Sequence, residues 1–190
     1  MRKTLRHGFL FGWFIGFVCA AAHAQAVRVG RPQAAVTPDT AVSSLSISAS
    51  PSSVSFHLVS KGTATGSSAV EITTTWGGTM CRSTCTLNLY GYFLSATAAL
   101  AGGSPVVDIP SSEVLGRVTT GTPTTYTAFT QSNPLGGSGA SLLLVKETFH
   151  PSTGGGSRTD ALSLEINLAN QPQLPAGTYS GTLYIEAQSL

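Results

Sequence analysis

Charged residues are scarce in this sequence, where they make up 9% of 190 residues. Ten are basic and eight are acidic, but three of the basic residues lie at the extreme N-terminus, which leaves seven against eight for the rest. These seven are scattered singly, whereas a protein that binds phosphates needs a clustered basic face. The composition therefore argues against nucleic acid as a partner. Abundant serine, threonine and glycine must keep the surface hydrated in place of ions.

Catalytic arrangements are also missing from the sequence. It has no G-x-S-x-G motif, and Gly137-Ser138-Gly139 lies in a glycine-rich loop without the strand and helix that such a nucleophile needs. The sequence therefore predicts a protein that is not an enzyme and that needs no cofactor or metal. Four glutamates fall within alternating segments at positions expected to face water: Glu71, Glu147, Glu165 and Glu186.

The first residues predict export. Three basic residues precede an apolar stretch from Phe9 to Ala22, and Ala22-His23-Ala24 has the small residues of a cleavage site. Residues 1–24 are therefore interpreted as a cleaved signal peptide. The apolar stretch is shorter than the roughly 20 residues that a membrane helix requires, so we expect no membrane span after cleavage.

The remainder of the chain predicts a leader and one domain. Residues 25–44 have no sustained period and contain Pro32 and Pro38, which indicates a flexible leader. Residues 45–190 are enough for one domain with a core. In that region apolar and polar residues alternate over short segments separated by Gly, Pro and Ser, which is typical of strands.

These segments predict an all-β fold, a single Ig-like antiparallel β-sandwich of about seven to nine strands. The clearest inward face is formed by Leu162, Leu164 and Ile166. Residues 112–118 fit a strand and a helical turn equally well. The segment from Ser141 to Phe149 is apolar on both faces at its start, which predicts cover on both sides.

Two cysteines of the expected mature chain lie close together, at Cys81 and Cys85. In an exported protein this spacing predicts a local disulfide. The alternatives are a metal pair and a redox dithiol. Zinc would need two further ligands, and His57 and His150 form no paired motif. A redox site would normally be C-x-x-C at the start of a helix.

Three aromatic residues near the cysteines are candidate binding residues. Tyr90 and Tyr92 alternate onto a predicted solvent face, and Trp76 ends the preceding predicted strand. Exposed rings of this kind could contact a glycan or a protein partner. The alternative is cross-strand aromatic packing, which sheets use routinely.

Three segments together resemble bacterial Ig-like domains of the BACON type: Leu45-Ser46-Ile47-Ser48-Ala49-Ser50-Pro51-Ser52-Ser53-Val54-Ser55-Phe56, the glycine-rich turn at 62–66 and Val70-Glu71-Ile72-Thr73. The resemblance covers about a quarter of the chain. It implies a β-sandwich of a secreted or surface protein, used as a spacer or as a sugar-contacting module.

The C-terminal third resembles the ends of fimbrial and spore-coat-U-like subunits, through Leu162-Ser163-Leu164-Glu165-Ile166, Leu174-Pro175-Ala176-Gly177-Thr178-Tyr179 and the alternating last segment. This resemblance implies assembly by strand donation, with other envelope or pilus-like subunits or a periplasmic chaperone as partners and with an outer-membrane usher. The assembly strand would present Leu183, Ile185 and Ala187. The same three residues could equally complete the domain's own core.

The sequence thus predicts an exported structural or assembly subunit, secreted to the periplasm or the cell surface of a bacterium. The alternative is a monomeric Ig-like module that binds glycans or proteins on the cell surface.

Overall fold

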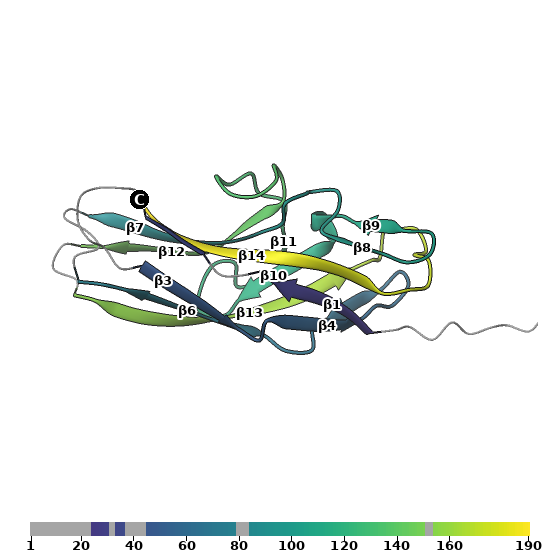
Figure 1. The fold of residues 1–190 in the computed structure, drawn as a ribbon, viewed down its shortest axis with the longest axis horizontal. Helices are drawn as coiled ribbons and strands as arrows, with labels where there is room; N and C mark the ends of the chain where they lie inside the picture. The colour runs from purple at the N-terminus through teal and green to yellow at the C-terminus, as the bar shows by residue number, and fades with distance from the viewer. Residues whose placement is uncertain (1–23, 31–32, 37–44, 79–83, 151–153) are drawn as a thin grey trace, which may run out of the picture.

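Two β-sheets stack on each other in the computed structural model of the chain (Figure 1). The structure describes residues 24–30, 33–36, 45–78, 84–150 and 154–190. Within them the one helical element is the 3-10 turn η1 (Ser111–Glu113), and no helix is long and apolar enough to cross a membrane. The predicted all-β sandwich is confirmed.

The first sheet has eight strands, five of them in the order β12-β7-β14-β1-β4. Two short strands pair with β14, and a third pairs with one of these two. The five are β12 (Ser141–Phe149), β7 (Cys85–Tyr92), β14 (Tyr179–Ser189), β1 (Ala24–Val29) and β4 (Ser53–His57), and the additions are β2 (Gln33–Val36), β8 (Leu100–Gly102) and β9 (Val107–Ile109).

The second sheet has six strands, five of them in the order β11-β10-β13-β6-β3. All of its pairings are antiparallel. Its strands are β11 (Thr127–Ala128), β10 (Val114–Val118), β13 (Gly156–Asn167), β6 (Val70–Trp76), β3 (Leu45–Ser50) and the short β5 (Thr63–Thr65), which pairs with β13.

The strands outnumber the seven to nine that were predicted, and most of the excess consists of short pieces. β5, β8 and β9 have three residues each, and β11 has two. Alternation of apolar and polar residues cannot be recognised over two or three residues, because a period of two becomes visible only over a longer segment. Residues 112–118, which fitted two structures, begin within η1 and continue as β10, where Val114, Gly116 and Val118 are buried and alternate with half-buried residues.

The prediction of a flexible leader is wrong for residues 25–30 and 33–36. Residues 25–44 were predicted to be flexible, yet β1 and β2 lie in this region and pair with β14 in the parallel direction. β1 also pairs antiparallel with β4 and so joins β4 to the sheet. Residues 37–44 and the predicted signal peptide up to residue 23 lie outside the described residues.

A bulge accounts for the apolar run at the start of β12. The pairing of β12 with β7 shifts between Leu143 and Val145. Leu142, Leu144 and Val145 are all buried in the core cluster, whereas Leu143 is half-buried. The bulge turns two consecutive side chains inward. On the outer face Ser141, which pairs with Tyr92, is 0% exposed and donates to the carbonyl oxygen of Leu135 in the loop before β12. The start of β12 is therefore covered on both faces, as predicted.

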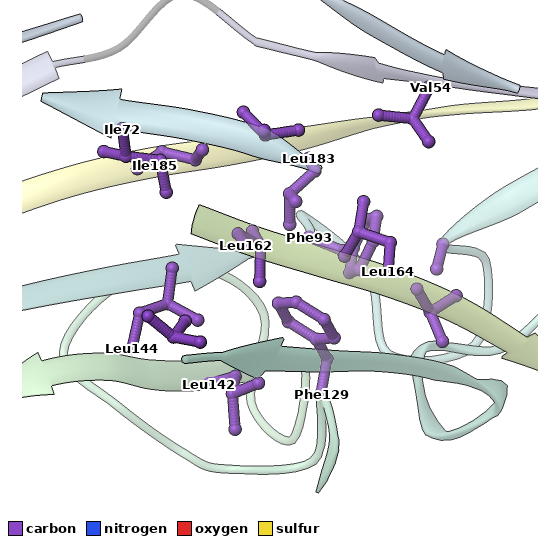
Figure 2. Packing of buried hydrophobic residues seen from close by; sticks show 14 of the residues in the cluster. Val54, Ile72, Phe93, Phe129, Leu142, Leu144, Leu162, Leu164, Leu183 and Ile185 are labelled. Atoms are coloured by element: carbon purple, nitrogen blue, oxygen red, sulfur yellow. The ribbon is translucent and has the colours of Figure 1, made fainter. Parts of the chain in front are cut away.

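The core lies between the sheets and collects the inward residues of both (Figure 2). Leu162 and Leu164 of β13 are 0% and 1% exposed, as their alternation predicts. Burying a side chain of this size contributes about 1.5–3 kcal/mol relative to exposure. Phe129 fills the space left by two glycines: a Cβ on Gly91 would lie 3.0 Å from its Cε1 atom, and one on Gly116 3.1 Å from its Cε2 atom.

Candidate assembly site along the last strand

β14 occupies a central position with both of its edges paired. On one edge β8 pairs with residues 179–180 and β7 with residues 184–189. On the other edge β1 pairs with residues 180–183 and β2 with residues 186–189. Both halves of that second edge are therefore covered by strands that are remote in sequence, within residues 24–36.

Main-chain hydrogen bonds hold the middle of this N-terminal segment. The Gly30 amide donates to the carbonyl oxygen of Leu183 at 2.5 Å, and the Val29 amide donates to that of Ser52 at 2.9 Å. Val29 also packs against the core cluster. The segment is thus an integral part of the sheet, although β1 and β2 have only six and four residues.

The inward face of β14 carries the three residues proposed for the assembly strand. Leu183, Ile185 and Ala187 are 0%, 1% and 0% exposed and belong to the core of this chain. Leu183 and Ile185 point toward the side chains of the second sheet in Figure 2. They pack among the inward residues of both sheets. Their role in assembly remains a prediction.

On the outward face of the first sheet, Tyr184 of β14 stacks on Tyr92 of β7. The rings of Tyr184 and Tyr92 lie 5.4 Å apart with an interplanar angle of 17°. The hydroxyl of Tyr92 donates to Oε2 of Glu186 at 3.4 Å. Burial, followed by the negative charge of Glu186, raises the pKa of the Tyr92 hydroxyl above 10.0. This Tyr92–Tyr184 stack matches the cross-strand packing that was the alternative to ligand binding.

Of the other two aromatic candidates, Tyr90 is covered and Trp76 lies on the second sheet, apart from this stack. Tyr90 pairs with Glu186 across the strands and is 6% exposed, so it presents little ring surface to a ligand. Trp76 contacts Phe149, with ring centroids 4.8 Å apart, and packs against the core cluster from the second sheet. The structure therefore does not bring Trp76, Tyr90 and Tyr92 together as one binding surface.

A small hollow of about 240 Å³ opens beside the Tyr92–Tyr184 stack. Its wall includes the half-buried Tyr184 and the hydroxyl-bearing Ser95, Ser180 and Thr182. Ligand sites for drug-sized molecules occupy about 300–1,000 Å³, so this hollow is smaller than that class. The described residues that line it are mainly alanine and other apolar residues, and none of them carries a carboxylate.

The sequence interpretation missed an ion network between the two sheets. Arg158 of β13 donates from Nε and Nη2 to the carboxylate of Asp160, each at 2.7 Å, and its Nη1 pairs with Glu147 of β12. Thr120 donates to Asp160 at 2.5 Å. Asp160 is 0% exposed. The available signal was the alternation of β13, which continues from Leu162 back to Asp160 and Arg158 on the inward face.

Two glutamates expected to face water do not do so freely. Glu147 is paired with Arg158, and Glu186 is 7% exposed beneath the tyrosines. Glu71 is exposed, as predicted, and Glu165 is half-buried. Glu186 is covered by long side chains of neighbouring strands on the outer face. Glu147 lies on the same inward side as Val145 and Phe149, because the bulge in β12 reverses the alternation expected from the sequence.

The cysteine pair remains a prediction, because Cys81 lies outside the described residues. Cys85 is half-buried at the start of β7, and Oγ of Ser189 lies 3.7 Å from its sulfur atom. Within the described ranges no three His, Cys, Asp or Glu side chains gather as they would around a metal ion.

The comparison with protein-family models gave no match, and neither did the comparison with curated proteins.

Proposed function

We propose that this chain is an exported, non-enzymatic envelope protein that assembles with other subunits by exchanging the strand beside β14. The observation that carries the proposal is the parallel pairing of β1 and β2 with one edge of β14. A strand supplied from a remote part of the chain can in principle be supplied by another copy, because the same main-chain bonds would form.

The two outer strands of the first sheet, β12 and β4, support the choice of this edge. At β4 the Ser67 amide donates to the carbonyl oxygen of Ser55, and the Ser55 amide donates to Oγ of Ser67. At β12 the amide of Leu143 donates to the side chain of Gln131. Capping of this kind discourages the addition of a foreign strand. The edge of β14 is different, since the strands that cover it come from a short segment that is remote in sequence.

Localisation and partners follow from the same proposal. The predicted signal peptide and cysteine pair fit the periplasm or the cell surface of a bacterium. The partners would be further copies, other envelope or pilus-like subunits, or a periplasmic chaperone that occupies the edge before assembly. Glycan or protein binding by a monomer remains the alternative, with Tyr92 as its half-buried candidate residue.

Mixing two isotopically distinct batches of mature protein tests the proposal. Native mass spectrometry should detect oligomers that contain both batches, and unboiled gels should show a ladder. Deleting residues 25–36 should abolish the ladder, and a synthetic peptide of these residues should bind the deleted protein. A strictly monomeric mature protein that never forms mixed species would overturn the proposal.

A further inference from the structure

We propose that Gly30 determines which strand fits beside β14, because the Tyr92–Tyr184 stack leaves no room for a side chain at that position. The inference rests on the proposed strand exchange, since Gly30 belongs to the exchanging segment. It specifies the partner as a strand that carries glycine at this point, which residues 24–36 of this chain or of a second copy provide.

The space around Gly30 is closed by side chains of β14. A Cβ atom on Gly30 would lie 3.0 Å from Cγ2 of Thr182, 3.0 Å from Cδ1 of Tyr184 and 3.2 Å from Cε1 of the same ring. Gly30 is not among the glycines with positive φ. Tight space, rather than backbone conformation, therefore favours glycine here.

Movement of Tyr184 toward Tyr92 is blocked by close packing. Its ring is stacked on Tyr92, and Tyr92 is backed by Gly136, where a Cβ would lie 2.7 Å from Cβ of Tyr92. The loop that carries Gly136 is tied to the end of β7 by the hydrogen bond from the Gly137 amide to the carbonyl oxygen of Phe93, at 2.9 Å. A row of close contacts thus runs from Gly136 through both tyrosines to Gly30.

The register of the N-terminal segment adds a second requirement. Val29 pairs with Leu183 and Gln33 pairs with Glu186, so the segment advances four residues where β14 advances three. A strand that occupies this edge must accommodate one extra residue between these two pairs. A plain alternating strand meets neither requirement.

Hydrogen exchange on the mature full-length chain tests the inference. In Gly30→Val, the amides of residues 26–36 and 180–189 should exchange at least about tenfold faster than in the wild type, because the segment no longer docks. Gly30→Ala should show a smaller change in the same direction. Gly154→Val is the matched control, since a Cβ at Gly154 would meet nothing within 4 Å, and it should leave exchange unchanged.

A compensating substitution keeps the test independent of a general folding defect. Tyr184→Ala removes the ring that the introduced valine side chain would strike, so the double variant Gly30→Val/Tyr184→Ala should exchange more slowly in these segments than Gly30→Val alone. Exchange in Gly30→Val equal to that in Gly154→Val would overturn the inference. The inference would also be overturned if the changes in exchange caused by Gly30→Val and Tyr184→Ala were additive in the double variant.

The inference and the proposed function can fail separately. If Gly30→Val loosens the segment but two labelled wild-type batches never mix, strand exchange is wrong and the role of Gly30 in seating its own segment stands. If the batches mix and Gly30→Val mixes equally well, the exchange stands and Gly30 does not select the strand.

Discussion

At the scale of single residues, the buried carboxylate of Asp160 is stable because it meets an oppositely charged partner and a hydrogen-bond donor. Asp160 lies on the same face as the leucines of β13, where an unpaired carboxylate would be very costly. Arg158 and Thr120 supply its hydrogen bonds, and Arg158 also reaches Glu147 on the facing sheet. The network therefore ties the two sheets together with polar contacts at one end of the core.

Replacing Asp160 by Ala should destabilise the sandwich strongly. The substitution leaves Arg158 partly buried with one carboxylate in place of two, and breaking a buried pair in this way costs about 3–5 kcal/mol. Urea unfolding followed by tryptophan fluorescence measures the change. Glu71→Ala, an exposed glutamate, is the control and should stay within about 0.5 kcal/mol of the wild type. Equal stabilities for the two variants would contradict the role given to the network.

Tyr179 links stability to high pH. Its side chain is 2% exposed, its hydroxyl donates to the carbonyl oxygen of Pro175 at 2.9 Å, and burial raises its pKa above 10.0. As the pH rises past 10, the unfolded chain releases this proton before the folded chain does, so stability present below pH 10 is lost.

Tyr179→Phe should remove that contribution. The variant should be less stable at pH 8 by about 1 kcal/mol, through the lost hydrogen bond, and should decline less between about pH 9 and pH 11. Urea titrations at several pH values measure both effects. Parallel declines of the two proteins would show that Tyr179 does not titrate differently on unfolding.

At the scale of elements, β12 shows how an outer strand is protected from further pairing. It ends the strand order of its sheet, and Gln131 accepts the hydrogen bond of the Leu143 amide at 2.8 Å. Lys146 is exposed further along the same strand. An inserted polar cap and a lysine are both known means of discouraging edge-to-edge association.

The double variant Gln131→Ala/Lys146→Val should therefore aggregate more readily than the wild type. It exposes the Leu143 amide and removes the charge from a strand rich in β-forming residues. Light scattering during incubation at a temperature below the unfolding transition measures the effect. Gln131→Ala/Lys146→Arg keeps the charge and should aggregate less than the valine variant. Indistinguishable scattering from the two would argue that this edge is not the site of association.

At the scale of the whole molecule, stability comes from pairing that is distant in sequence, so a local disulfide should contribute modestly. The predicted Cys81–Cys85 ring has so few residues that loop-closure entropy limits its stabilisation to about 2 kcal/mol, compared with about 4.7 kcal/mol for a loop of about 100 residues. Mass spectrometry should show that neither cysteine is alkylated before reduction and that both are alkylated after it.

Reduction should lower the melting temperature of the mature protein by several degrees, since about 1 kcal/mol corresponds to about 2–4 °C in a domain of this size. Cys81→Ser/Cys85→Ser should melt at the temperature of the reduced wild type. Alkylation of both thiols without prior reduction would contradict the disulfide.

The sequence by itself determined the fold class and the inward faces of the long strands. Leu162, Leu164 and Ile166, and likewise Leu183, Ile185 and Ala187, are buried as their alternation predicts. This succeeds because the side-chain period of a strand is a local property of the chain, readable from about five or six residues.

Only the tertiary structure decided what lies beside β14. Ala26 pairs with Ser180 across almost the whole length of the chain, and the short segments around it show no period of their own. Their strand conformation is stabilised by hydrogen bonds to β14 and β4, which no local pattern encodes. The same reason hid the need for Gly30, since only the tertiary structure brings the tyrosine ring of β14 against it.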